Sequence, residues 1–206
     1  MGHRALVAYE RPDGLYNCHY SHWGGMNLKL TDKLSTETPF GGHTPSKEIQ
    51  AYFEELLEIP RDASFESPPP TNDCPIDLDP LEVAITLDDI AFTTLDYLHH
   101  EAFYVVSESF EVTPYRTCWL GLTQDAETIE AAPTIGNGAY YTVRWYEGVP
   151  VGDGVMRGRC KALKDCTGDM LDRGVFDEES ATRYMIQKLR AWTRDQELHV
   201  TRPAQP

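Results

Sequence analysis

The chain has 206 residues, 41% of them hydrophobic, and carries 33 Asp and Glu against 18 Lys and Arg, for a formal net charge of −15. This length suits one core that buries roughly 70% of the surface exposed by the unfolded chain. We therefore predict a single domain over residues 1–206. A disordered acidic tail is excluded, because the acidic residues are spread along a chain with 11% aromatic residues.

The basic residues are unevenly chosen, since twelve are Arg and only six are Lys. A surface this acidic repels itself when the screening length is roughly 8 to 10 Å, and the repulsion is relieved at molar salt, where that length falls to roughly 3 Å. Scarce Lys beside abundant Asp, Glu and Arg favours a halophilic protein over an ordinary acidic one.

The start of the chain, MGHRALVAYE, lacks the pattern of a signal peptide, and no apolar run approaches the roughly 20 residues of a membrane span. These features predict a cytoplasmic protein without a membrane partner. The five cysteines are odd in number and form no Cys-x-x-Cys pair, which argues against a disulfide framework and a zinc knuckle. We expect no metal and no cofactor.

Residues 4–23 indicate a β-hairpin, because two β-prone runs flank a turn of sequence Arg-Pro-Asp-Gly at residues 11–14. If Glu10 faces Leu15, alternate residues fall on opposite faces of the hairpin. The face expected to pack on the core carries Ala5, Val7, Tyr9, Tyr16, Cys18, Tyr20 and His22. The other face carries Leu6, Ala8, Glu10, Asn17, His19, Ser21 and Trp23.

The middle of the chain predicts further elements around a Pro-rich loop. Thr44 as N-cap and Pro45 as first residue predict a helix that runs to about Glu58. Residues 60–80 hold six of the fourteen prolines and are expected to form a surface loop. Thr86 and Asp89 have capping-box spacing, which predicts a helix from residue 87. Strands are expected at residues 102–106, 115–122 and 139–146, with Pro114 joining the first two.

The C-terminal part indicates a helical hairpin. Residues 155–173 place Met156, Cys160, Leu163, Thr167 and Met170 on one helical stripe, which ends at Gly174. Asp177 then caps a second helix, whose buried stripe is expected to be Ala181, Met185, Leu189 and Trp192. The fold class is therefore α+β: a mainly antiparallel sheet, opened by the N-terminal hairpin and covered by helices that include this C-terminal pair.

One candidate site lies at the end of the N-terminal hairpin, in the sequence HYSHWGG. His22 meets a pair of glycines there, a geometry that leaves a side chain at a pocket rim, and its imidazole could serve as a general base at neutral pH. His19 and His43 are the candidate catalytic partners, and Trp23 is a candidate binding residue. The alternative interpretation is that His22 and Trp23 only close the sheet by packing.

A second candidate site emerges when the charge is partitioned. Residues 1–154 carry 8 basic and 25 acidic side chains, for a net charge of −17, whereas residues 155–206 carry 10 basic and 8 acidic side chains, for a net charge of +2. Basic stripes on the two C-terminal helices could contact phosphates. Their members are Arg157, Lys161 and Lys164 on the first helix and Arg183, Arg190 and Arg194 on the second. Pairing with acidic neighbours is the alternative.

With the stretches ALVAYERPDGLYN, HYSHWGG, HEAFYVVS, VRWYEG and GDMLDRGVF in view, the chain resembles a family of uncharacterised haloarchaeal proteins that carries only a domain-of-unknown-function label. The resemblance spans most of the chain except the Pro-rich loop. It implies an origin in haloarchaea or their viruses, in line with the charge. It supplies no activity and no catalytic residues.

Two function classes follow from these observations. The first is a non-enzymatic binding or regulatory module that contacts a protein or a nucleic acid through the C-terminal helices, which the charge partition favours. The second is a small hydrolase or nuclease that uses His22 with His19 or His43, which the histidines beside paired glycines favour. Convergence of His22, Trp23 and His43 around a cleft would favour the enzyme.

Overall fold

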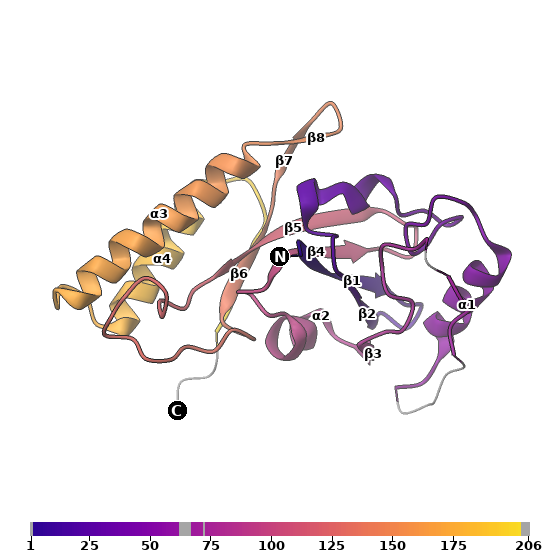
Figure 1. The fold of residues 1–206 in the computed structure, drawn as a ribbon, viewed down its shortest axis with the longest axis horizontal. Helices are drawn as coiled ribbons and strands as arrows, with labels where there is room; N and C mark the ends of the chain where they lie inside the picture. The colour runs from indigo at the N-terminus through magenta and orange to yellow at the C-terminus, as the bar shows by residue number, and fades with distance from the viewer. Residues whose placement is uncertain (1, 62–66, 72, 203–206) are drawn as a thin grey trace. The chain divides into compact units, whose positions relative to one another are not determined.

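A computed structural model describes residues 2–61, 67–71 and 73–202. It confirms the α+β class: a seven-stranded mixed, mostly antiparallel sheet has the order β3-β2-β1-β4-β5-β6-β9, and β7 and β8 form a separate pair (Figure 1). The strands are β1 Arg4–Glu10, β2 Tyr16–Ser21, β3 Glu82–Ile85, β4 His100–Val106, β5 Val112–Trp119, β6 Gly138–Thr142, β7 Arg144–Tyr146, β8 Val149–Val151 and β9 Leu198–Thr201. The helices are η1 Met26–Asp32, α1 Lys47–Glu58, α2 Leu87–Asp89, η2 Ile90–Thr94, α3 Asp153–Asp172 and α4 Glu178–Thr193.

The chain folds into two compact units. The first unit comprises Met1–Leu95 and His100–Tyr115, and the second comprises Asp96–His99 and Arg116–Pro206. Strand β5 contributes to both, because the division falls after Tyr115. The expectation of a single domain stays a prediction. Among the described residues, none of the helices combines the length and the apolar composition that a membrane span requires.

The N-terminal hairpin forms with a register one residue away from the expected one. Glu10 pairs with Tyr16, because Gly14 takes a φ of 75° and the Arg11 amide donates to the Leu15 carbonyl at 2.9 Å, which leaves Leu15 in the connection. Residues Asn17, His19 and Ser21 therefore lie beside Tyr9, Val7 and Ala5. The expected single core face is wrong as well: residues 5–9 are all buried, because β1 is a central strand between β2 and β4.

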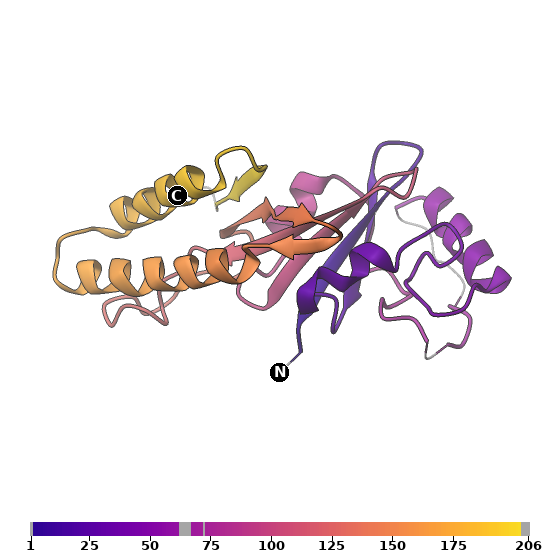
Figure 2. The same ribbon diagram turned by 90° about the horizontal axis from the view of Figure 1, so that it is seen from above.

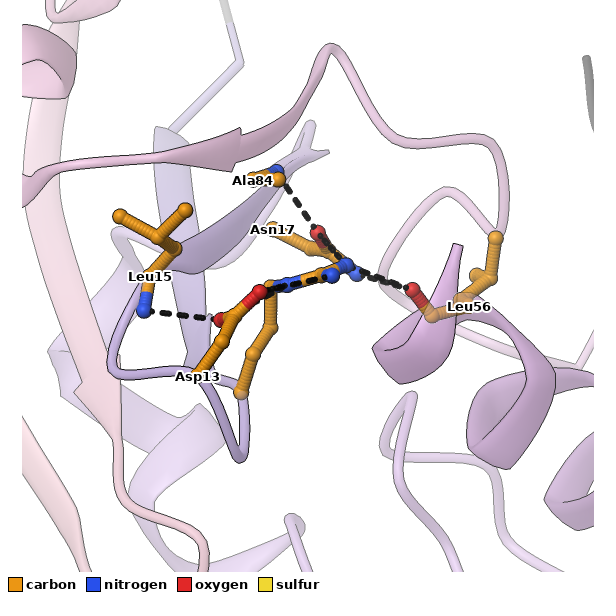
Figure 3. Close-up of polar contacts among 6 residues, drawn as sticks. Asp13, Leu15, Asn17, Leu56 and Ala84 are labelled. Atoms are coloured by element: carbon orange, nitrogen blue, oxygen red, sulfur yellow. Dashed lines mark hydrogen bonds and ion pairs between the residues drawn. The ribbon is translucent and has the colours of Figure 1, made fainter. Parts of the chain in front are cut away.

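A buried polar network holds the first unit together around Asn17 (Figure 3). The Asn17 Oδ1 atom accepts hydrogen bonds from Nη1 of Arg11 at 3.2 Å and from the backbone N–H of Ala84 at 3.1 Å. Its Nδ2 atom donates to the Leu56 carbonyl at 2.6 Å, and Arg11 Nη1 donates to the same carbonyl at 3.2 Å. One amide side chain on β2 thus joins the first turn, the end of α1 and β3.

Helix α1 begins later than the sequence predicts. Its N-cap is Ser46, whose hydroxyl accepts a hydrogen bond from the Ile49 amide, and not Thr44. Ser46 is extended, with φ −128° and ψ 123°, so Pro45 lies before the helix and not in its first turn. The expected end at Glu58 is confirmed.

The described part of the Pro-rich segment, residues 60–61, 67–71 and 73–80, contains no helix or strand, as expected, while residues 62–66 and 72 lie outside the description. Ile76 is fully buried, and the Asp77 amide donates to the Tyr20 carbonyl at 2.8 Å. This part therefore runs against the edge of β2 and leads into β3, a strand that the sequence reasoning missed.

Helix α2 begins at Leu87 with the predicted Thr86 cap, but after three residues it continues as the π-helical turn η2.

Strand β5 starts at Val112 and so contains Pro114, which was expected to precede it. The strand expected at residues 139–146 is two strands, because β6 pairs with β9 whereas β7 pairs with β8. Strand β9 was not predicted.

Helices α3 and α4 confirm the C-terminal helical hairpin and lie side by side (Figure 2). Asp177 caps α4 as predicted, since its Oδ1 atom accepts from the Ser180 amide at 2.7 Å. Their buried stripes contain Cys160, Leu163, Thr167 and Leu171 of α3 and Ala181, Met185 and Leu189 of α4. Met156, Met170 and Trp192, expected in these stripes, are only half-buried.

Candidate functional site

A groove of about 420 Å³ lies in the second unit, where the start of α3 meets the end of α4 and the β7–β8 hairpin. Because the two helices are antiparallel neighbours, the first turns of α3 lie beside the last turn of α4 (Figure 1). The apolar part of the lining includes Tyr141, Val155, Met156 and Trp192. The charged part consists of Arg144, Arg159, Arg194 and Asp153.

The groove has a positive electrostatic balance in a chain of net charge −15. The carboxylate among its described lining residues, on Asp153, is bound by the guanidinium of Arg116, with Nη2 to Oδ2 at 2.7 Å and Nε to Oδ1 at 3.0 Å. The Arg116 side chain is 1% exposed, so this pair is a buried, charge-assisted contact. Because Arg116 neutralises Asp153, the arginines give the described lining an excess of positive charge, which attracts anions.

Two of these arginines have identified neighbours. The Arg159 guanidinium carbon lies 5.8 Å from the centre of the Trp192 ring, which is a cation–π contact. Arg144 pairs with Asp195 at 2.8 Å, but both side chains are more than half exposed, so an incoming anion can displace this weak pair. A planar cation backed by an indole is a surface on which flat, negatively charged groups stack.

A cluster of polar side chains fixes the wall of the groove. The Tyr141 hydroxyl lies near the Cys160 thiol on α3, which in turn lies near Cys118 on β5, so the three groups affect one another's pKa. The hydrogen bond to Cys160 and burial raise the pKa of Cys118, whereas hydrogen bonds from Cys118 and Tyr141 lower the pKa of Cys160 against the effect of burial. These contacts tie α3 to the sheet beneath it.

The end of the N-terminal hairpin, in the first unit, carries a second group of polar and aromatic side chains. His22 is exposed, and its Nδ1 atom lies 3.0 Å from the Tyr20 hydroxyl. Its ring meets Trp23 edge-on at 5.0 Å, and His3 lies 6.1 Å from the same indole. His3 also pairs with the Glu101 carboxylate at 3.0 Å. His22 and Trp23 therefore lie at the strand end, as expected.

The other two candidate histidines lie elsewhere in this unit. His19 is buried, with Nδ1 at 3.0 Å from the Asp77 carbonyl and with Nε2 lacking a hydrogen-bond partner among the residues that the structure describes. The backbone N–H of His43 donates to the Asp73 carboxylate at 2.9 Å. Within the described residues, no hydrogen bond or ring contact joins His43 to His22. A set of three or more His, Cys, Asp or Glu side chains that could hold a metal is likewise absent from these residues.

Burial lowers the pKa of His19 to about 4, which makes the stability of the fold depend on pH. The unfolded chain binds a proton near pH 6.5 and the native state only near pH 4, so stability is complete above pH 6.5 and falls as the pH decreases toward 4. We expect a loss of about 3 kcal/mol by pH 4 from this residue.

Chemical denaturation between pH 7 and 4 measures this loss, and the variant His19→Gln, whose side chain does not titrate, should show a shallower dependence. Equal slopes for the two proteins would contradict the assignment.

The model of a family of unknown function (DUF6735) matches residues 1–200. The chain belongs to this family. The match covers both compact units, so the groove and the hairpin end both lie within it. Neither the search of curated proteins nor the search of solved structures finds a match.

The structure separates the six basic residues predicted from the charge partition. Arg194 lines the groove. Lys164 is held over the Trp119 ring at 4.3 Å and beside Asp125 at 3.1 Å, and Arg183 is paired with Glu179. Arg157, Lys161 and Arg190 are exposed and do not line the groove.

Sequence reasoning missed Arg144, Arg159 and Trp192 as groove residues. Arg159 could have been predicted from the charge partition, because it belongs to the basic C-terminal segment. Arg144 lies outside that segment, and Trp192 was assigned to the core.

Proposed function

We propose that this protein is a nucleic-acid-binding module whose second unit holds a single-stranded segment in the groove between α3, α4 and the β7–β8 hairpin. The observation that carries the proposal is the meeting of three arginines with the half-buried Trp192 in a groove of about 420 Å³. Phosphates suit the guanidinium groups, and an unstacked base suits the surface that Arg159 and Trp192 present.

The overall charge of the chain decides which contacts must supply the affinity. A net charge of −15 repels a polyanion at long range, so local contacts have to overcome this repulsion. Phosphate contacts weaken with salt: for single strands, the logarithm of the binding constant falls by about 0.7 per contacted phosphate for each tenfold rise in salt concentration. Stacking does not depend on counterion release and contributes roughly 1–3 kcal/mol per base. We therefore expect stacking at Trp192 to dominate binding in concentrated salt.

Binding of a fluorescent single-stranded oligonucleotide, followed by anisotropy over a series of salt concentrations, tests the proposal. The change Trp192→Ala should weaken binding about 5- to 150-fold, which corresponds to the loss of one stacked base. The changes Arg159→Gln and Arg194→Gln should each weaken binding and reduce the salt slope by about 0.7. The matched control is Arg183→Gln on α4, the helix that Arg194 caps at its C-terminal end, because Arg183 is engaged by Glu179.

Two outcomes would overturn the proposal. One is an effect of Arg183→Gln equal to that of Arg194→Gln, which would show that only the general charge matters. The other is binding of an acidic polypeptide such as polyglutamate that depends on the arginines but not on Trp192, because the groove would then recognise a protein partner. Circular dichroism of each variant ensures that the loss does not reflect unfolding.

The hydrolase or nuclease hypothesis stays a prediction for the exposed His22. Its partner His19 is buried with a pKa of about 4, so His19 is poorly suited to take up a proton at neutral pH. The carboxylate–imidazole pair of Glu101 and His3, beside Trp23, is the arrangement at this end that most resembles an oriented base. We favour the binding module, since its groove brings together groups that suit one kind of ligand.

We also propose that the protein works in concentrated salt. Acidic side chains crowd the exposed side of α1, where Glu48, Glu54, Glu55 and Glu58 all face solvent. Screening of such like charges should raise the melting temperature by about 5–10 °C between dilute buffer and several molar KCl, at roughly 2–4 °C per kcal/mol for a chain of this size. A thermal melt at each salt concentration measures this rise, with sorbitol as the uncharged control. A melting temperature independent of KCl would contradict the inferred habitat.

A further inference from the structure

The first unit contains a cavity of about 240 Å³ that the proposed function does not use. It lies between the indole of Trp23 and the segment η1, with Pro75 as a further wall. Among its lining residues, Leu30 is 3% exposed, whereas Met26 and Trp23 are 36% and 54% exposed. The cavity is thus an apolar depression beside an exposed tryptophan.

The exposed position of Trp23 is built into the fold. His22 packs edge-on against the indole on one side. The chain then passes close to its neighbours through two glycines: a Cβ atom on Gly24 would lie 2.7 Å from the Leu30 side chain, and one on Gly25 would lie 2.9 Å from Glu101. Because larger residues would clash there, the turn that carries Trp23 outward depends on both glycines.

The segment that faces Trp23 has a strained backbone. Asn27 and Leu28 take φ values of 52° and 55°, in the left-handed region that residues other than glycine rarely adopt. The fully buried Leu28 side chain and a hydrogen bond from Thr31 Oγ1 to the Leu28 carbonyl at 2.9 Å hold this conformation. Strain of this kind is typical of segments that position ligand contacts.

That segment and its C-cap residue place two positive charges on the cavity. Lys29 and Lys33 both line it, although the whole chain contains only six lysines, and no acidic residue is among the described residues of its lining. Neither ammonium group forms an ion pair within the described part of the chain. The cavity therefore combines apolar walls with positive charge, and a ligand that complements it has an apolar body and one negative group.

We propose that this cavity binds a small aromatic carboxylate, with its ring between Trp23 and Leu30 and its carboxylate on Lys29 and Lys33. Its volume is below the roughly 300–1,000 Å³ of sites for drug-sized ligands, so a single ring fits better than a nucleotide. Aromatic stacking on the indole supplies the apolar contact, and the two ammonium groups supply charge-assisted hydrogen bonds.

Benzoate and its neutral analogue benzamide are the probes. We expect benzoate to bind saturably at millimolar concentrations in ligand-observed NMR, and benzamide to bind about tenfold or more weakly, because it lacks the charge that the lysines recognise. The double variant Lys29→Gln with Lys33→Gln should show the same loss for benzoate. Its matched control is Lys47→Gln, an exposed lysine at the start of α1. The tryptophan fluorescence change on binding should disappear in Trp23→Phe.

Equal affinities for benzoate and benzamide would overturn the proposal, as would equal losses in the double variant and in Lys47→Gln. Lack of saturable benzoate binding would do so as well. The Trp23→Phe variant retains an aromatic side chain at the cavity but lacks the Trp23 indole. If benzoate still changed the tryptophan fluorescence of this variant to the same extent, the ligand would bind elsewhere. Oligonucleotide binding is measured separately and does not depend on these variants, so failure here leaves the proposed function standing.

Discussion

Replacing Asn17 by Leu is expected to lower the free energy of unfolding by about 3–5 kcal/mol, since each buried polar group left without a partner costs roughly 1–3 kcal/mol. Leu has a similar volume but no hydrogen-bonding groups. The Ala84 N–H would lose its acceptor, Arg11 would lose one of its acceptors, and the Leu56 carbonyl would lose its shorter hydrogen bond. The side chain is 1% exposed, so water cannot replace these partners.

Urea denaturation followed by circular dichroism measures this change. The matched control is Asp13→Asn, which weakens the pair between Asp13 and Arg11 at 3.1 Å but keeps an oxygen for the Leu15 amide. Because the Asp13 side chain is 47% exposed, this control should cost less than about 1 kcal/mol. If Asn17→Leu were as mild as the control, the network would not hold β2, α1 and β3 together as described.

Replacing Arg116 by Met is expected to destabilise the second unit by about 3–5 kcal/mol, the usual cost of removing one partner from a buried ion pair. The loss arises at Asp153, whose side chain is only 14% exposed and would keep a charge without its bidentate partner. The same change should weaken oligonucleotide binding, because an uncompensated carboxylate in the groove repels phosphates.

A double-mutant cycle separates the interaction from the effects of each change. Asp153→Asn in the Arg116→Met background should recover part of the stability, since it removes the unpaired charge. The cycle is measured by chemical denaturation of the four proteins. Strictly additive effects of the two substitutions would contradict a direct contact between these side chains.

The local signals in the sequence were sufficient for most element types. The turn around Gly14, the Thr86 cap of α2 and the Asp177 cap of α4 are contacts within a few residues, so they could be predicted from the chain alone. The register of the first hairpin could not be predicted in this way, because it depends on whether Leu15 belongs to the turn or to the second strand, and in the structure it belongs to the turn. Strands β3 and β9 have only four residues each and are recognisable only through their partners β2 and β6.

The candidate site shows the same division. The charge partition pointed to the C-terminal helices, and Arg194 lies in the groove. The basic stripes themselves did not predict which residues line the groove. Lys164 and Arg183 form ion pairs with acidic neighbours, and helical periodicity does not reveal such pairs. Arg144 reaches the groove from β7, a strand that had been merged with β6.

The sequence by itself determined the α+β class, the C-terminal helical hairpin and the uneven distribution of charge, because these depend on composition and on periodicity along the chain. Only the tertiary structure decided which face of each strand is buried and which arginines meet Trp192. Burial and convergence are set by partners distant in sequence, such as Arg116 and Asp153, and the free energy of such contacts exists only once the elements that carry them have packed.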